Sequence, residues 1–540
     1  MDATILAVVA AYFAVSLGTG FWVARKEKKR ADDYFLAGRK LPWYAVALSM
    51  TGSNIGTEHF IGMVGTAYAF GLAPATFEWG NFIPYSMLVW IFLPYLFRKK
   101  LYTIPEFLER RYSQSTRCTF ASLSLLHMVI AVLTPALYAG GRIIYQMAFQ
   151  RQIASFNWGF MGCVLVISAV TAAYCIYGGL LSVVWTDVLQ VAVLLAGGLL
   201  LVLIGVQRAG GLNEVIQANC SADATRCHLI QSASHKVSPW PGVATFWMTL
   251  SMAYVATNQF YIQRCLGAKS EWDAKMGVIG CAFIKFFLPV IIVFPGMVAF
   301  ALFGGGLAED SVYVRMINEL LPPLGRGVLL AALTAAIMST VSSVLNSAST
   351  IWSMDVYKRL LRPAAHEQEV VRVGRWSTFI VIVIGTSLTP VLVLWREGLF
   401  LFIQNMYGLF APAIAVIFVA AFFWRRAHAR AATFTLVFGF VVAATLWILT
   451  LTVRAAWVRP LDPLLNRAAV TLVLCFGALI FATFLVRRSP EESYDPQIIW
   501  NRRWAHLPQA ERALNRGLRN LMFWWIVLIS GSVAIFVVFG

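Results

Sequence analysis

Long apolar runs alternate along this chain with short polar or basic segments. Fourteen runs of about twenty residues are nearly free of charge, which is the length that a helix needs to cross about 30 Å of hydrocarbon. They begin near residues 2, 43, 76, 119, 157, 183, 242, 276, 327, 376, 399, 431, 466 and 520. The pattern predicts an all-α polytopic membrane protein with about 14 transmembrane helices.

Charge adds an orientation to this picture. Of 540 residues 59% are hydrophobic and 13% charged, and the formal net charge is +18. The basic residues form short clusters between apolar runs, which argues against a nucleic-acid surface. The clusters are RKEKKR (25–30), FRKK (97–100), YKRLLR (357–362), WRRAHAR (424–430) and NRRWAHLPQAERALNRGLRN (501–520). All of them fall on the cytoplasmic face if both termini are outside, as the positive-inside rule favours.

The first apolar run is expected to be a retained span. It lacks a small-residue cleavage site, and its basic cluster follows the run, whereas the basic region of a signal peptide precedes it.

Two of the eight cysteines differ from the rest. Cys220 and Cys227 flank SADATR in the long outward loop, so they either form a disulfide in an oxidising compartment or remain free. The other six lie in spans or beside cytoplasmic loops, as small buried hydrophobic residues do. No spacing of cysteine or histidine resembles a zinc or haem site.

The second apolar run contains polar residues that are costly in hydrocarbon. The stretch TGSNIGTEHFIGMVG includes Asn54 and His59, and its glycines at positions 52, 56 and 62 weaken its helix. One interpretation is a helix that unwinds midway and exposes carbonyls for a small cation. The alternative is a glycine-rich helix that packs closely on a neighbour. The two polar side chains favour the first, because packing alone does not require them.

At this point the motifs indicate a family. The segment SNIGTEHFIGMVGTAYAFGLAPATFEWG (53–80) closely resembles the sodium:solute symporter family, in particular its sodium/glucose cotransporter branch. Further matching segments follow in the family's order: IYGGLLSVVWTDVLQ (176–190), PWPG (239–242), NQFYIQRCLGAKS (258–270), IKFFLPVIIVFPGM (284–297) and IMSTVSSVLNSASTIWSMDVYKR (337–359). The resemblance extends from about residue 34 to residue 421, and the last three spans lie outside it.

The resemblance implies a LeuT-type core of two inverted five-helix repeats, with a site at the midplane where the first helix of each repeat is broken. The expected divisions are an extra N-terminal span and basic loop (1–42), a first repeat (43–207), an outward loop (208–241), a second repeat (242–423) and three peripheral spans (424–540). Each repeat opens with polar residues inside an apolar run.

The resemblance also implies a sodium site. In the family, two carbonyls at the first break and a carbonyl with two hydroxyls on the eighth core helix hold the ion, a neutral oxygen set that suits a hard cation. These positions correspond to Gly52, Ile55, Ala336, Ser339 and Thr340. The alternative is that the hydroxyls only bond backbone carbonyls within their own helix.

A second sodium ion is also open. Asp187, Ser342 and Ser343 match residues that form an additional sodium site in some relatives. Asp187 could instead make a salt bridge or cap the inner end of a helix.

The family's sugar contacts correspond to polar residues within apolar runs. Amides, charged groups and aromatic faces together suit a ring that bears hydroxyls. The expected substrate residues are Asn54, His59, Glu78, Tyr254, Asn258, Lys285 and Gln404, and Phe260 matches the inner gate. Glu78 and Lys285 are the most costly to bury, so they are expected to meet the substrate, or else to form a structural ion pair between two helices.

Two departures leave the substrate open. Val255 stands where animal cotransporters have a tryptophan, and Glu58 adds an acid beside His59 where relatives commonly have a small residue. Glu58 could face the cavity, or pair with an arginine such as Arg142.

The predicted function is therefore sodium-driven uptake of a glucose-like or galactose-like sugar by alternating access, with sodium as the co-transported ion. The alternatives are a symporter of inositol, sialic acid or an organic acid, and a sugar sensor that does not transport. An enzyme is not expected, and no nucleotide-binding G-x-x-x-x-G-K-[ST] is present. The expected partners are the sugar, sodium and the lipid bilayer, with neither nucleic acid nor an obligate protein partner, in a plasma membrane that the short loops suggest is a bacterial inner membrane.

Overall fold

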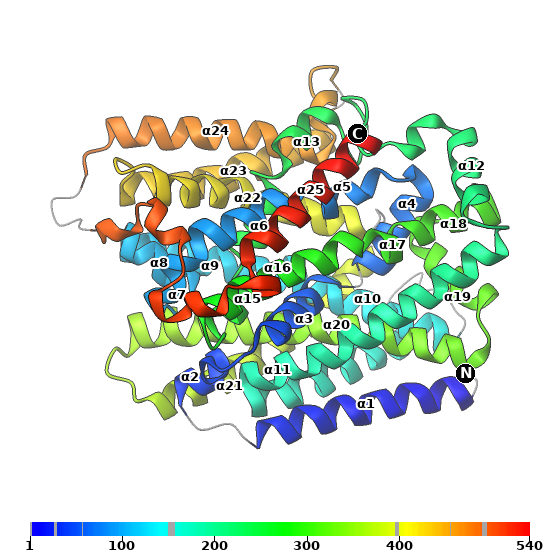
Figure 1. Cartoon of the computed structure of the whole chain (residues 1–540), viewed down its shortest axis with the longest axis horizontal. Helices are drawn as coiled ribbons and strands as arrows, with labels where there is room; N and C mark the ends of the chain where they lie inside the picture. Colours follow the sequence, from blue (N-terminus) through cyan, green and yellow to red (C-terminus); the bar gives the residue numbers. More distant parts are fainter. Residues whose placement is uncertain are drawn as a thin grey trace.

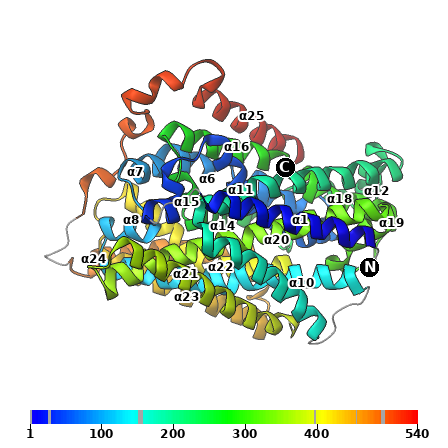
Figure 2. The same ribbon diagram turned by 90° about the horizontal axis from the view of Figure 1, so that it is seen from below.

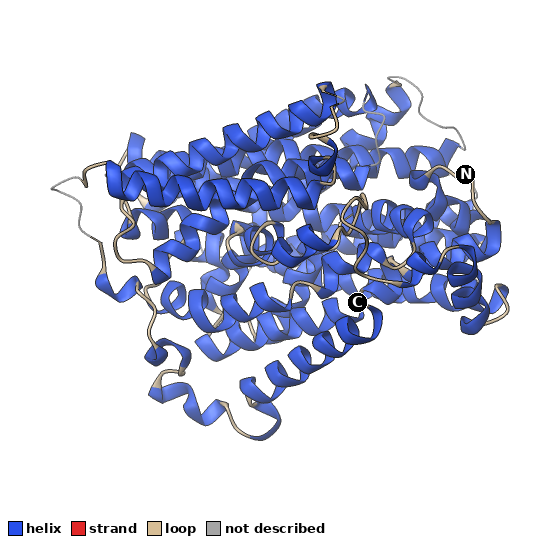
Figure 3. Ribbon diagram, turned by 90° about the horizontal axis from the view of Figure 1, so that it is seen from above, coloured by secondary structure: helices blue, strands red, loops and turns tan. Residues whose placement is uncertain are grey.

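The computed structural model describes residues 3–25, 30–56, 58–149, 157–394, 399–453, 455–488 and 494–540, and nearly all of its regular structure is helical (Figure 3). Ten helices in these ranges are long and apolar enough to cross a membrane, or eleven if one bent pair counts as a single span. The all-α membrane architecture expected from the sequence is therefore present. The count of fourteen spans stays a prediction.

The helices of the first half are α1 (Ala3–Ala24), α2 (Ala31–Leu36), α3 (Trp43–Asn54), α4 (Val64–Phe70), α5 (Thr76–Trp79), α6 (Phe82–Met87), α7 (Leu93–Arg98), α8 (Ile104–Arg111), α9 (Gln114–His127), α10 (Thr134–Phe149) and α11 (Trp158–Arg208). Those of the second half are α12 (Leu212–Ala222), α13 (Trp240–Phe246), α14 (Leu250–Ala256), α15 (Gln259–Leu266), α16 (Glu271–Phe287), α17 (Pro289–Ile292), α18 (Phe294–Phe303), α19 (Val312–Leu320), α20 (Pro323–Ile351), α21 (Glu367–Leu388) and α22 (Leu399–Phe423). The last three are α23 (Ala429–Thr452), α24 (Leu464–Leu485) and α25 (Leu521–Phe539).

The 51-residue α11 consists of two arms that fold back on each other. Gly179 has φ 48° and ψ −149°, a backbone conformation that glycine adopts readily and that interrupts the helix. A Cβ atom built on Gly20 of α1 would lie 2.8 Å from Tyr174 and 3.6 Å from Thr186, which are on opposite arms. The arms therefore correspond to the runs that begin near residues 157 and 183.

Two helical segments are interrupted where the sequence places polar residues. α3 ends at Asn54, Ile55 is extended, and a π-helical turn over Glu58–Met63 leads into α4. α14 ends before Asn258, whose side-chain oxygen accepts a hydrogen bond from the amide of Phe260 at 3.4 Å and caps α15. Both interruptions lie within apolar runs.

Helix α20 forms the centre of the molecule and is buried along most of its length (Figure 1). α3 and α16 pack closely, since a Cβ built on Gly277 would lie 2.6 Å from Val46. α1 and α24 lie at opposite edges in Figure 1, and α25 lies along another edge in Figure 2. Interrupted helices therefore occupy the interior, and the long apolar helices surround them.

One end of the molecule holds the start of α1, the long loop and the end of α25. Gly327 in the first turns of α20 packs against Ile5 of α1, and the amide of Leu229 donates to the carbonyl of Phe539 at 2.7 Å. Gly205, near the end of α11, packs against Leu320, just before α20. Both termini thus share an end with the long loop, and the assignment of this end to the outside stays a prediction.

Candidate functional site

A buried ion pair lies between the two halves of the chain. The Nζ atom of Lys285 on α16 is 2.8 Å from Oε2 of Glu78 on α5, and these side chains are only 2% and 3% exposed. The Nε2 atom of His59 is 3.2 Å from Oε1 of the same carboxylate, and Lys285 also donates to Oδ1 of Asn54. Four of the predicted substrate residues therefore converge from three separate segments. Their mutual contacts offset part of the cost of burying charge.

His59, Glu78 and Lys285 border a cavity of about 500 Å³, and Asn54 contacts it only through Lys285 and Tyr254. Its lining consists of His59, Met63, Phe77, Glu78, Asn81, Phe246, Leu250, Ser251, Tyr254, Lys285, Phe400, Ile403, Gln404 and Tyr407. The hydroxyl of Tyr254 on α14 donates to the carbonyl of Asn54 at 3.2 Å. The second interrupted helix therefore contacts the first at the point where α3 ends. Charged groups, amides and aromatic faces thus surround one space, the composition that a small polar ligand with an apolar face requires.

Sequence reasoning missed part of this lining. Asn81 accepts a hydrogen bond from Ser251, and Tyr407 contacts Tyr254 edge to face at 5.3 Å between ring centroids. Asn81 and Ser251 are polar residues within apolar runs, so the signal that identified Gln404 was available for them too.

Asn258 lies outside this cavity. It lines a second cavity of about 380 Å³ together with Ser124, His127, Thr257, Gln259 and Phe410, and Tyr407 lines both cavities. The edge-to-face pair of Tyr254 and Tyr407 therefore stands where the two cavities approach each other. The predicted gate residue Phe260 is adjacent, with its ring centroid 6.5 Å from that of Tyr254.

The second cavity contains a histidine that the sequence did not single out. The His127 ring lies 4.4 Å from Tyr407, and its Nε2 atom has no hydrogen-bond partner among the described residues.

The break after α3 meets α20 at the predicted sodium residues. The amide of Gly56 donates to Nδ1 of His59 at 3.3 Å and to the carbonyl of Asn54 at 3.2 Å, so the helical hydrogen-bond pattern stops before it reaches the Gly52 carbonyl. A Cβ built on Gly52 would lie 2.9 Å from Oγ of Ser339, so the backbone of Gly52 closely approaches this hydroxyl. The predicted sodium ligands from both helices are thus neighbours.

The remaining predicted sodium ligands lie on α20 and at the break after α3. The hydroxyl of Thr340 donates to the carbonyl of Ala336 at 3.2 Å, and Ile55 has φ −87° and ψ 91° and is fully buried. Neutral oxygens grouped at an unwound turn can coordinate a monovalent cation without adding a full charge.

Asp187 lies next to this group in a buried ion pair. Its Oδ2 is 2.9 Å from Nη2 of Arg264, and its Oδ1 accepts from Ser339 at 2.6 Å. Arg264 also donates to Ser343 at 2.6 Å and to Ser49 at 2.5 Å. Ser342 donates to the carbonyl of Ser339 at 3.0 Å. Sequence analysis did not single out Arg264, although an arginine at this depth in an apolar region is itself a signal.

The side chain of Glu58 lies outside the described residues. Arg142, the partner considered for it, is 3.1 Å from Asp310.

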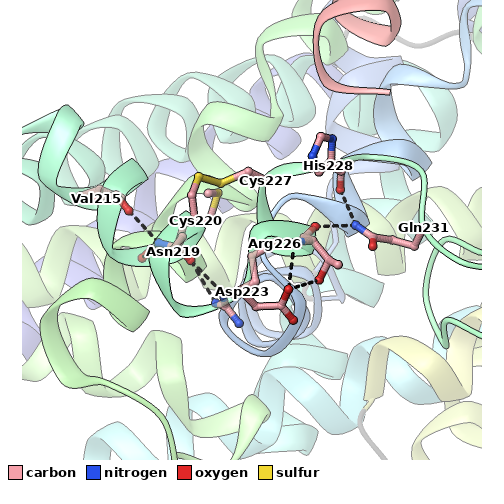
Figure 4. Close-up of a disulfide and its surroundings, with 10 residues drawn as sticks. Val215, Asn219, Cys220, Asp223, Arg226, Cys227, His228 and Gln231 are labelled. Atoms are coloured by element: carbon pink, nitrogen blue, oxygen red, sulfur yellow. Dashed lines mark hydrogen bonds between the residues drawn. A yellow bond between two sulfur atoms is a disulfide. The ribbon is translucent and has the colours of Figure 1, made fainter.

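The long loop contains a disulfide, which was one of the two alternatives that the sequence left open. A disulfide joins Cys220 and Cys227, and Arg226 lies between them (Figure 4). The guanidinium of Arg226 donates to the carbonyls of Ala69 at 2.7 Å and Tyr68 at 2.8 Å, in the last turn of α4. The loop therefore fixes one end of the interrupted helix that carries His59 at its other end.

Comparison with known proteins identifies the family. Residues 34–439 match the model of the sodium:solute symporter family. The chain belongs to the sodium:solute symporter family. It is 34% identical to the sodium/glucose cotransporter of Vibrio parahaemolyticus over 453 residues, which cover 79% of this chain and 81% of that protein.

Other members of the family show similar likeness. The human sodium/myo-inositol cotransporter is 31% identical, with 84% of this chain and 68% of that protein covered. The sodium/mannose cotransporter of Bos taurus is also 31% identical, with 92% and 88% covered. A solved structure of a Na⁺-coupled sialic acid symporter in a substrate-bound outward-open state superposes with a TM-score of 0.73 at 20% identity, covering 91% of this chain and 99% of that one.

This symporter therefore has the LeuT-type fold that the resemblance implied. It is a multi-pass membrane transporter that co-transports sodium with a solute, and it is not an enzyme. The family membership confirms the prediction made from the motifs.

Proposed function

We propose that this symporter couples inward sodium flux to the uptake of a hexose such as glucose or galactose by alternating access. The observation that supports the proposal best is the cavity bounded by the Glu78–Lys285 pair, His59 and Gln404, with Tyr254 as an aromatic face. A carboxylate accepts two or more hydroxyl hydrogen bonds, an ammonium donates up to three, and an amide does both. The ring hydroxyls of a hexose fit this set, and a ring face fits the aromatic wall.

A polyol such as myo-inositol is the second candidate. It presents the same hydroxyl chemistry, and relatives named for glucose, myo-inositol and mannose have similar identity to this chain. The charges in the cavity are already paired with each other, which argues against a solute that carries its own carboxylate.

We infer that sodium binds the carbonyls of Gly52, Ile55 and Ala336 and the hydroxyls of Ser339 and Thr340. The ion would join the break after α3 to α20 and so fix Asn54 and His59, which are next in the chain. Sodium and solute would then stabilise the same arrangement, and this linkage is the basis of coupled transport. At 100 mV each inward charge contributes about 2.3 kcal/mol to accumulation.

A second sodium ion at Asp187, Ser342 and Ser343 requires a rearrangement, because Arg264 already neutralises Asp187. One sodium ion per solute is therefore the simpler expectation.

The interrupted segments at Asn54 and Asn258 support two repeats over residues 43–207 and 242–423. We also infer that the protein lies in a plasma membrane, the inner membrane of a bacterium.

The test is uptake of radiolabelled glucose, galactose, mannose and myo-inositol into proteoliposomes with an inward sodium gradient. Potassium replaces sodium in the control. We expect sodium-dependent accumulation of a hexose by the native protein, and loss of accumulation in both Gln404→Ala and Ser339→Ala.

Other outcomes are equally informative. Sodium-dependent binding without uptake would identify a sensor. Accumulation of myo-inositol alone would establish the second candidate, and no response to any of the four solutes would reject the sugar proposal.

A further inference from the structure

The segment between residues 500 and 520 is a positively charged stretch on the face that the positive-inside rule assigns to the cytoplasm. It contains five arginines and one glutamate, so its formal charge is +4 with histidine neutral. All five arginines are solvent exposed: Arg502, Arg503, Arg512, Arg516 and Arg519. The segment lies along the outer edge of the molecule with α25 (Figure 2).

One side of this segment is fixed to the helix bundle. Arg98 of α7 donates to the carbonyl of His506 at 2.5 Å, and the carboxylate of Glu511 accepts from the amide of Trp272 at 2.8 Å. The indole of Trp272 in turn donates to the carbonyl of Arg519 at 3.0 Å. The backbone is therefore held against α7 and the start of α16, and the arginine side chains extend from the other side.

That other side combines basic and apolar groups. Leu514 is 36% exposed and Leu518 is 78% exposed, and both lie among the arginines. The indole of Trp524, in the first turn of α25, donates to the carbonyl of Leu518 at 2.6 Å. Because α25 is an apolar helix long enough to span a bilayer, Leu518 lies where a span begins, at the depth of the lipid headgroups.

We propose that this segment is a docking surface for anionic phospholipids. Its arginines bind headgroup phosphates, and its exposed leucines enter the boundary between headgroups and acyl chains. Two observations select a lipid surface among possible acidic partners. The segment continues directly into a span, so a headgroup is always within reach, and its alternation of arginine with exposed leucine matches the interface between charge and hydrocarbon.

Lipid bound here would act on the transport core through α16. The segment rests on the first turn of the helix that carries Lys285, so a headgroup that holds the segment in place also holds that end of α16. This proposal does not depend on which solute is transported.

The test uses the full-length protein in a neutral detergent, titrated with phosphatidylglycerol or phosphatidylcholine and followed by native mass spectrometry and thermal unfolding. We expect preferential binding of phosphatidylglycerol and a higher unfolding temperature with it. Each arginine near an anionic surface contributes about fivefold in affinity, so the triple variant R503Q/R516Q/R519Q should bind phosphatidylglycerol roughly a hundredfold more weakly.

The matched control removes three exposed arginines at the opposite end of the molecule, in the variant R208Q/R315Q/R459Q. It should keep the native affinity for phosphatidylglycerol. Native affinity in the first variant, or an equal loss in the control, would overturn the proposal. If the first variant fails to fold, the native protein still decides: its preference for phosphatidylglycerol should fall as salt rises, and a preference independent of salt would overturn the docking surface.

Discussion

The guanidinium of Arg264 lies 2.9 Å from the carboxylate of Asp187, and neither side chain is exposed. This contact joins α15, directly after the second interruption, to the second arm of α11. It places a full positive charge beside the hydroxyls expected to hold sodium. The pair therefore bears both on the stability of the core and on the number of sodium ions.

Substitution Asp187→Asn should destabilise the protein, because it leaves Arg264 buried without a counter-charge. Breaking a buried pair costs about 3–5 kcal/mol, which thermal unfolding in detergent will show as a clear fall in the midpoint temperature. Asp310→Asn is the control, since its pair with Arg142 is partly exposed and should contribute about 1 kcal/mol or less. Equal effects of the two changes would contradict this account.

One positive charge should move inward with each solute molecule, because Arg264 already neutralises the carboxylate of Asp187 and leaves no second sodium site there. Reversal potentials of proteoliposomes at several solute gradients measure this ratio. A ratio of two in the native protein that falls to one in Ser343→Ala would show that Arg264 releases the carboxylate and that a second sodium ion binds there.

Substitution Glu78→Gln should weaken solute binding more than sodium binding. It removes the charge that orients both Lys285 and His59, and a hydrogen bond to a charged group contributes about 1.5–3 kcal/mol, so the solute KM should rise roughly ten- to hundredfold. The sodium concentration for half-maximal uptake should change little.

A matched buried pair provides the control for this prediction. Glu271 and Lys275 are 3.0 Å apart and fully buried on α16, away from the cavity. Glu271→Gln should therefore lower stability without raising the solute KM. A similar KM change in both variants would mean that Glu78 acts through the fold alone.

Substitution Thr340→Val should raise the sodium requirement, because it removes one hydroxyl oxygen from the proposed ion site and nearly preserves the volume of the side chain. Loss of one ligand should raise the half-saturating sodium concentration about tenfold, the effect of roughly 1.4 kcal/mol. Ser349→Ala is the control on the same helix, because its hydroxyl donates to the carbonyl of Gly374 on α21. Native sodium dependence in Thr340→Val would contradict the assignment.

The disulfide between Cys220 and Cys227 should stabilise the end of α4 that Arg226 holds. Closing a loop of this size restricts the unfolded chain, which adds about 2–3 kcal/mol to the free energy of unfolding. The double change to serine should therefore lower the unfolding temperature, and dithiothreitol should do the same to the native protein only. Lowering by dithiothreitol in the serine variant as well would point to another cause.

The family, the membrane architecture and several polar residues of the cavity were predictable from sequence. Charge within hydrocarbon is costly, so Glu78 and Lys285 stood out without any coordinates. Asn54 and His59 stood out because polar side chains are also costly in hydrocarbon, and the glycines beside them indicated where α3 would end.

Distances across the fold were decided by tertiary structure alone. Periodicity gives the face of a helix but not its neighbour, so neither the contact of Arg264 with Asp187 nor the separation of Asn258 into a second cavity could be derived from spacing. The sequence by itself determined which residues had to be buried with partners, because hydrocarbon leaves no alternative. The packing of α3, α11, α15 and α20 determined which partners they found, because it brings together residues that are far apart along the chain.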